Sequence, residues 1–157
     1  MEYRIIGIND QYLSEALTLV WRVFLEFEAP EYSDEGVDEF KRYIAPDAIK
    51  ERLNKDELKM RVCLDSDSVV GVIAMRPLCH ISLMFVDKQY HKQGIARALF
   101  EHLLDEVKAE GKHKKMTVFS SPYAAGFYRK VGFADTDMEQ TVNGIRFFPM
   151  TRSIEAN

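Results

Sequence analysis

The sequence predicts an α/β (α+β) fold: a mixed, mostly antiparallel sheet of about seven strands with a central parallel pair, flanked by helices. Short runs rich in β-branched and aromatic residues alternate with segments whose apolar residues keep helical spacing. One such run, residues 80–87, leads through a basic loop and a helix into a further strand. That connection places the two strands in parallel. Turn signals at residues 65–68 and 143–144 indicate hairpins that supply the antiparallel part.

The first half of the chain reads as one strand, a helical region and a hairpin. Asn9 or Asp10 can cap the first helix, whose apolar residues keep helical spacing as far as Phe27, and Pro30 ends it. The other elements expected here are strands over residues 3–8, 58–64 and 69–75 and helices over residues 34–44 and 47–53.

Residues 80–111 organise the rest of the chain. The strand is followed by a loop whose only glycine is Gly94, then by a helix that Gly111 can cap. The helix carries one apolar stripe, formed by Ile95, Leu99, Leu103 and Val107. This arrangement aims the free N–H groups of the first helical turn, and the positive end of the helix dipole, at one spot. Such a spot binds an anion, usually phosphate.

The carboxyl-terminal part is expected to complete the sheet. A strand over residues 116–119 is followed by a short helix over residues 122–131, with Pro122 in its first turn and Gly132 at its end. Two strands over residues 138–142 and 145–150 then flank Asn143-Gly144, a strong hairpin signal.

The loop at Gly94 narrows the choice of phosphate ligand. It lacks the Gly-Lys-Ser/Thr ending of a P-loop and the G-x-G-x-x-G of a dinucleotide fold. His91-Lys-Gln-Gly94-Ile-Ala96 instead resembles motif A of the Gcn5-related N-acetyltransferase (GNAT) superfamily, Gln/Arg-x-x-Gly-x-Gly/Ala, with His91 as the departure. The resemblance implies that the pyrophosphate of acetyl-CoA binds here, at His91, Lys92, Gln93, Gly94, Ile95, Ala96 and Arg97.

A second segment resembles motif B of the same superfamily, Asn-x-x-Ala-x-x-x-Tyr-x-x-x-Gly-Phe. Tyr128, Gly132 and Phe133 match it, and Ser121 stands where Asn commonly binds the pantetheine arm. The resemblance implies that Tyr128 lies beside the CoA sulfur and protonates the departing thiolate, as a phenol of pKa near 10 can. Taken alone, Tyr128 also fits a helix aromatic packed on the core. The order of elements resembles the GNAT fold throughout, which implies one domain over residues 1–157.

The strand before motif A supplies further candidates. The resemblance implies that it splays from its neighbour and that the backbone of Met84, Phe85 and Val86 pairs with pantetheine. His80, at its start, is either the general base that takes a proton from an ammonium substrate or a structural histidine. Met116 stands where another group of the superfamily carries a Glu that acts as the general base, so that base is absent here.

Composition excludes several classes of protein. The 157 residues are 46% hydrophobic and 29% charged, with a net charge of −4, which argues against a membrane protein and against nucleic acid as the main partner. The amino-terminal segment lacks the basic start of a signal peptide, and Cys63 and Cys79 indicate neither a disulfide framework nor a zinc site. This cysteine usage suits a reduced cytoplasm, where we expect the protein. The four histidines fall on different elements, so we expect no metal.

The acceptor is the least defined part of the prediction. Residues 26–39 hold seven acidic residues, interleaved with Phe27 and Tyr32, and no Lys or Arg. They form either a wall that favours an amine or a solvated helix face. We therefore expect a transferase of the acyltransferase class: an acetyl-CoA-dependent N-acetyltransferase, monomer or homodimer, that acts on a small-molecule or peptide amine in a ternary complex. The alternative is a non-catalytic acyl-CoA-sensing module on the same fold.

Overall fold

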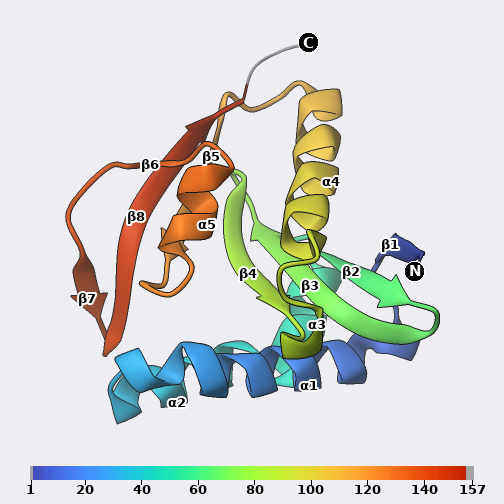
Figure 1. Cartoon of the computed structure of the whole chain (residues 1–157), viewed down its shortest axis with the longest axis horizontal. Helices are drawn as coiled ribbons and strands as arrows, with labels where there is room; N and C mark the ends of the chain where they lie inside the picture. The colour runs from blue at the N-terminus through green and yellow to red at the C-terminus, as the bar shows by residue number, and fades with distance from the viewer. Residues whose placement is uncertain (1, 155–157) are drawn as a thin grey trace.

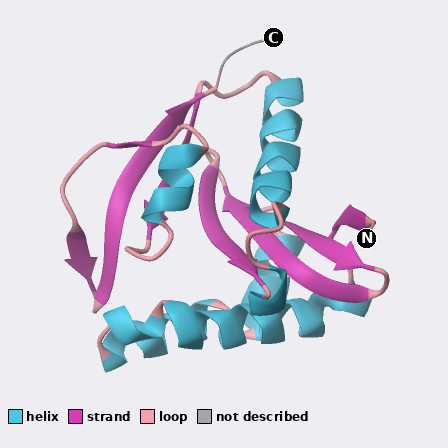
Figure 2. Cartoon of the chain, viewed as in Figure 1, coloured by secondary structure: helices cyan, strands magenta, loops and turns pink. Residues whose placement is uncertain are grey.

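A computed structural model of the chain describes residues 2–154, which form an eight-stranded sheet with helices on both faces (Figure 2). The strand order is β1-β2-β3-β4-β5-β8-β6, with β7 paired to β8. All neighbours are antiparallel except β4 and β5, which are parallel as predicted. The strands are β1 Tyr3–Gly7, β2 Lys59–Asp65, β3 Ser68–Arg76, β4 His80–Val86, β5 Lys115–Ser120, β6 Ala134–Asp135, β7 Gln140–Val142 and β8 Ile145–Ser153.

The helices begin and end where local chemistry dictates. The Asn9 side chain accepts a hydrogen bond from the N–H of Tyr12 at 3.2 Å and caps the first helix, and the Ser33 hydroxyl caps the second. The fourth helix lies between Gly94 and Gly111, both in the left-handed conformation. The helices are α1 Asp10–Phe27, α2 Asp34–Tyr43, α3 Pro46–Asn54, α4 Ile95–Glu110 and α5 Ala125–Lys130, with short 3-10 turns η1 Ala29–Glu31 and η2 Lys88–Tyr90.

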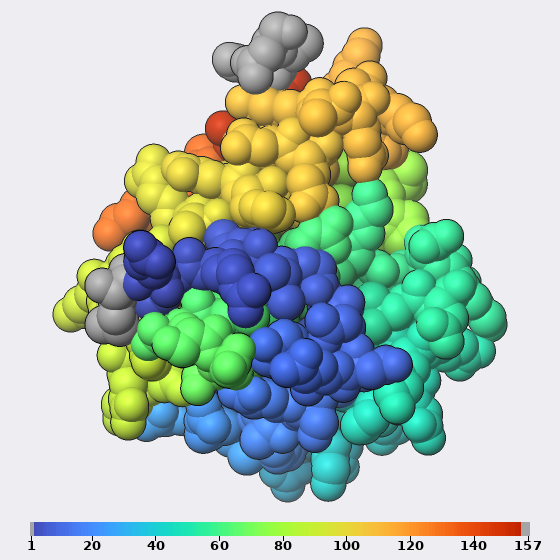
Figure 3. All heavy atoms as spheres, turned by 90° about the vertical axis from the view of Figure 1, so that its right-hand side faces the viewer, coloured from blue at the N-terminus to red at the C-terminus, as the bar shows by residue number. Residues whose placement is uncertain are grey.

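Two apolar cores lie on opposite faces of the sheet. Helices α1, α2 and α3 pack against one face, where Phe24 is fully buried, and α4 and α5 pack against the other, where Leu99 is fully buried. Strand β1 forms one edge of the sheet, and Figure 3 shows it at the surface (blue), below α4 (yellow to orange). No helix in residues 2–154 combines the length and apolarity needed to cross a bilayer.

The sheet opens between β4 and β5. Among the described residues these strands share two residue pairs, His80–Thr117 and Ile81–Val118. In the ladder with β3, Met75 pairs with Ile81 and Ala74 with Leu83, so Ser82 is an inserted bulge residue of β4. The bulge bends β4 at the point where pairing to β5 stops. Figure 1 shows the two halves of the sheet diverging toward α1 and α2.

The predicted fold class is confirmed, with one short strand beyond those expected: Ala134 and Asp135 pair with β8 as β6, so the sheet has eight strands across residues 2–154. Two predicted element boundaries need correction. The helix expected from Pro122 begins at Ala125, because the Ser121 hydroxyl accepts the N–H of Ala124 and holds the preceding residues in a turn. The penultimate strand starts at Gln140, two residues later than expected.

Candidate functional site

Three segments meet at the open end of the sheet: the carboxyl end of α1, the loop from β4 to α4, and the loop from β5 to α5. Phe27, the last residue of α1, joins them. Its ring lies 5.1 Å from the ring of His91 and is stacked on Tyr123 at 5.0 Å, centroid to centroid. One aromatic residue of the first helix therefore holds both loops in place.

The loop from β4 to α4 presents an uncapped helix start. Gly94 has φ of +81° and Lys92 has φ of +64°, and α4 has no side-chain cap and no acidic residue in its first turn. A Cβ on Gly94 would meet no described atom within 4 Å. Lys92 is exposed in the loop and Arg97 in the first turn of α4, where Arg97 also pairs with Glu101 at 3.0 Å. Free N–H groups, the helix dipole and two cations make the space fit for a pyrophosphate.

Other predicted loop residues have structural contacts. The His91 Nε2–H donates to the carbonyl oxygen of Val86 at 2.8 Å, so His91 closes the end of β4. The side-chain oxygen of Gln93 accepts the hydroxyl of Tyr3 at 2.5 Å. Ile95 is buried in the core under α4, and Ala96 is partly buried against the same core. These contacts fix the loop conformation.

The side chains of Met84, Phe85 and Val86 point into the protein. Phe85 and Val86 are buried on opposite sides of the sheet, and Met84 is partly buried. All three pair with β3 and lie beyond the last pair with β5. A ligand between the two strands can meet their backbone groups, as the extended part of an added strand would.

Tyr128 is buried in α5, 4% exposed, with its ring against Phe127 and Phe133. Burial raises the pKa of its phenol well above the ordinary value, and the negative charge of Glu28 raises it further. Like any phenol it is protonated at neutral pH, and the raised pKa keeps it so across the physiological range. Gly132, which follows the helix with φ of +103°, leaves room for Arg152, whose Nε lies 2.8 Å from the position of a Cβ there.

Glu28 is a site residue that the sequence did not single out. Burial raises its pKa to about 7; a hydrogen bond from the Ser121 hydroxyl opposes this rise, and the charge of Glu31 adds to it. Ser121 itself is buried and also accepts the N–H of Ala124 at 3.1 Å. The signal for Glu28 was the acidic run over residues 26–39, which does not say which carboxylate turns inward.

His80 lies elsewhere, at the closed end of the sheet. Its Nδ1 and the Thr117 hydroxyl are hydrogen-bonded at 2.7 Å, and its ring meets Phe119 edge-on at 4.6 Å. Burial, and then the charge of Arg76, lowers its pKa to about 4. At neutral pH it is an uncharged imidazole with one nitrogen engaged.

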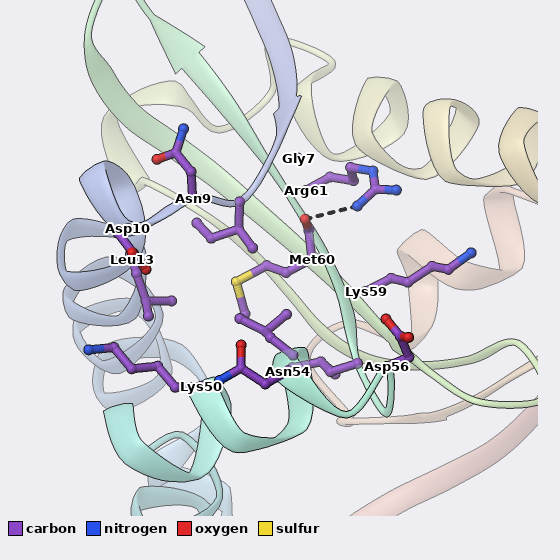
Figure 4. Close-up of a pocket in the computed structure, with 13 residues that line it drawn as sticks. Gly7, Asn9, Asp10, Leu13, Lys50, Asn54, Asp56, Lys59, Met60 and Arg61 are labelled. Carbon is purple, nitrogen blue, oxygen red and sulfur yellow. Dashed lines mark hydrogen bonds between the residues drawn. The ribbon is translucent and has the colours of Figure 1, made fainter.

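Two hollows flank these elements. A cavity of about 340 Å³ is lined from β1, α1, α3 and β2, including Asn9, Asp10 and Lys50 (Figure 4), and is separate from the three segments of the site. A second, of about 410 Å³, lies where α1 meets η2. Ion pairs Arg22–Asp87 at 2.9 Å and Lys88–Glu26 at 2.8 Å link the two elements there.

Comparison with solved structures gives the same fold. The chain is similar to a GCN5-related N-acetyltransferase from Rhodopseudomonas palustris, with a TM-score of 0.83 and 18% identity over 98% of this chain and 96% of that one. It is also similar to the PaiA N-acetyltransferase from Thermoplasma acidophilum in complex with coenzyme A, with a TM-score of 0.80 and 15% identity over 98% and 99%. For an aminoglycoside 6'-N-acetyltransferase complexed with coenzyme A, the TM-score is 0.68 at 16% identity over 98% of each chain.

No curated protein sequence matches the chain. The sequence profile of the acetyltransferase (GNAT) domain, in contrast, matches residues 28–154, which include both loops and all of the sheet except β1. The chain therefore belongs to the GNAT acetyltransferase family.

Proposed function

We propose that this protein is an acetyl-CoA-dependent N-acetyltransferase, which transfers the acetyl group to a primary amine of a small molecule or peptide. The observation that carries the proposal is the position of the Tyr128 phenol, which α5 buries against Phe127 and Phe133 and close to Glu28. A module that only binds acyl-CoA needs no proton donor there.

The cosubstrate site in this proposal runs from the loop at Gly94 to the gap between β4 and β5. The pyrophosphate binds the free N–H groups of α4, with Lys92 and Arg97 nearby. The pantetheine arm pairs with the backbone of residues 84–86, which β5 leaves unpaired. The coenzyme A complexes among similar folds support a CoA-type cosubstrate.

The chemistry is direct transfer. The amine nitrogen attacks the thioester carbonyl carbon, and backbone N–H groups near residues 84–86 stabilise the oxyanion. The carbon–sulfur bond breaks, and the thiolate takes the phenol proton of Tyr128. An N-acetylated amine and CoA leave, with net release of one proton when the acceptor enters as an ammonium ion.

The alternative is an acyl-CoA-sensing module. One departure from the motif favours it: Ser121 replaces the Asn that commonly binds pantetheine, and its hydroxyl hydrogen-bonds to Glu28. The two functions differ in turnover and not in CoA affinity.

The test is a panel of amines incubated with acetyl-CoA, with thiol release as the readout. We expect turnover by the wild type and a fall of roughly 10²- to 10⁴-fold in kcat for Tyr128→Phe, the usual effect of losing a positioned proton donor. Calorimetry should show unchanged CoA affinity in that variant, because the ring remains.

Tyr12→Phe is the matched control, since Tyr12 is also a buried helical tyrosine and its hydroxyl bonds to Asp67, in the β2–β3 turn. It should keep full turnover. CoA binding by the wild type without turnover on any amine would establish the sensing module instead.

A further inference from the structure

The carboxyl end of α1 carries unusual negative charge. Glu28 is the C-cap residue, and its N–H donates to the carbonyl oxygen of Phe24 at 2.9 Å. The carboxyl end of a helix favours cations, yet α1, within the described chain, has no basic residue in its last turn. A carboxylate at this position is the opposite of what helix stability favours.

The charge is turned inward among polar groups from three segments. The residues that interact with Glu28 through a hydrogen bond or through charge come from η1 and the residue after it, from the β5–α5 loop and from α5. We call them the Glu28 cluster: Glu28, Glu31, Tyr32, Ser121, Tyr123 and Tyr128. The charge of Glu28 contributes to the raised pKa of each of the three tyrosines. Tyr128 is the residue to which the proposed function assigns protonation of the leaving thiolate.

Two neighbouring acidic residues have cationic partners. Glu26 pairs with Lys88 at 2.8 Å, and Glu39 pairs with Arg42 at 2.6 Å. The Oε2 atom of Glu31 is buried and, among the described residues, has no hydrogen-bond partner. The Glu28 cluster therefore holds two carboxyl groups that lack a cationic partner within residues 2–154.

We propose that Glu28 is a catalytic residue: its carboxylate binds the ammonium group of the acceptor and takes its proton before attack on the thioester. This inference rests on the proposed acetyltransferase function and names its general base. Ser121 and Glu31 are positioning residues, because both act through Glu28. The Ser121 hydroxyl donates a hydrogen bond to the Glu28 carboxylate, and the negative charge of Glu31 raises the pKa of Glu28.

The protons balance as follows. The Glu28 carboxylate takes one proton from the acceptor ammonium, and the free amine forms the nitrogen–carbon bond. When the carbon–sulfur bond breaks, the thiolate takes the proton of Tyr128. The N-protonated amide that remains gives its extra nitrogen proton to the Tyr128 phenolate, which restores the phenol, and Glu28 releases its proton to solvent.

The surroundings tune Glu28 for this task. A base works best when its pKa lies near the working pH, and burial brings the pKa of Glu28 to about 7. His80, with a pKa of about 4 and one nitrogen bonded to Thr117, is a far weaker proton acceptor.

The experiment measures kcat and kcat/KM from pH 5 to 9 for the wild type, Glu28→Gln, Glu31→Gln and the control Asp38→Asn, an exposed acid of α2. We expect Glu28→Gln to lose about 10²- to 10⁴-fold at pH 7, with the deficit shrinking at higher pH as free amine accumulates. Glu31→Gln should move the acidic limb of the profile to lower pH, because it removes a charge that raises the pKa of Glu28. Asp38→Asn should match the wild type.

The outcomes separate the two proposals. If the wild type turns over and Glu28→Gln has the same rate and the same pH profile, the role of Glu28 is overturned and the acetyltransferase function stands. Loss of CoA affinity in Glu28→Gln, measured by calorimetry, also overturns it, since the carboxylate would then serve the cosubstrate. If Glu28→Gln does not fold, Glu31→Gln provides the test. An acidic limb at the same pH in Glu31→Gln as in the wild type then overturns the role of Glu28. Absence of turnover by the wild type with every amine overturns the acetyltransferase function itself, and this inference with it.

Discussion

The backbones of Gly36 and Gly144 pack directly against each other, so that a Cβ on Gly36 would overlap the carbonyl oxygen of Gly144. The N–H of Ser33 donates to the same oxygen at 3.2 Å. Through this contact the start of α2 is joined to the β7–β8 turn. The contact ties the layer of α1, α2 and α3 to the hairpin of β7 and β8.

Gly36→Ala should therefore destabilise the protein by about 1–3 kcal/mol, the usual cost of forcing a methyl group into a packed contact. Chemical denaturation measures it. Gly126→Ala is the control, because a Cβ at Gly126 in α5 meets no described atom within 4 Å, and alanine there should be neutral or stabilising. Equal stability of the two variants would contradict the packing argument.

Gly94→Glu should abolish CoA binding while the fold survives. The new side chain enters the open space before α4, where it blocks the pyrophosphate and repels it. Calorimetry with CoA gives the affinity, and circular dichroism gives the fold.

Gly111→Glu is a closely matched control for that variant. Gly111 caps the other end of α4, has φ of +66° and also faces open space. It carries the same backbone strain and the same added charge, so its CoA affinity should stay at the wild-type level. A similar loss in both variants would mean that strain, and not the site, is responsible.

Glu28→Gln should stabilise the protein at alkaline pH even though it removes the proposed base. The pKa of Glu28 is about 7 in the folded protein against an ordinary value of 4.5, so the folded state holds this proton more tightly. Stability therefore falls as pH rises from about 4.5 to 7, and the loss is complete above pH 7. We expect Glu28→Gln to melt a few degrees higher than the wild type at pH 8 and at the same temperature at pH 4. A gain that does not depend on pH would contradict the raised pKa.

His80→Ala should lower stability by about 1 kcal/mol through loss of the bond to Thr117, and leave the shape of the pH–rate profile unchanged. Its imidazole is uncharged over the whole range from pH 5 to 9, because its pKa is about 4. Loss of the acidic limb in this variant would instead identify His80 as the base.

Much of the fold could be read from the sequence, because its signals are local. Asn9 and Gly111 mark helix ends, and Asn143-Gly144 marks a hairpin, through backbone chemistry that needs no distant partner. The parallel pairing of β4 and β5 followed from the connecting helix. Strand β6 was missed because two residues that pair only through β8 carry no pattern of their own.

The candidate site was only partly predictable. Motif residues such as Gly94 and Tyr128 stand at fixed spacings, which a sequence displays directly. Glu28, in contrast, follows Phe27, whose aromatic contacts with His91 and Tyr123 join three segments that lie far apart in the sequence. The bulge at Ser82 is likewise a property of the ladder with β3 and not of the strand alone.

The joining of Glu28 to Ser121 and Tyr128 also has a consequence for biosynthesis. Strands β1 to β4, helices α1 to α3 and the loop at Gly94 leave the ribosome first, and the whole of their shared core comes from that part of the chain. Tyr128 and the β7–β8 turn arrive last, and contacts between segments so far apart in sequence form slowly. A nascent or truncated chain that lacks the last third thus exposes the unpaired side of β4, a ready template for pairing with another chain. The side of β4 that faces the gap in the finished protein is therefore, during synthesis, an exposed strand edge that can pair with another chain.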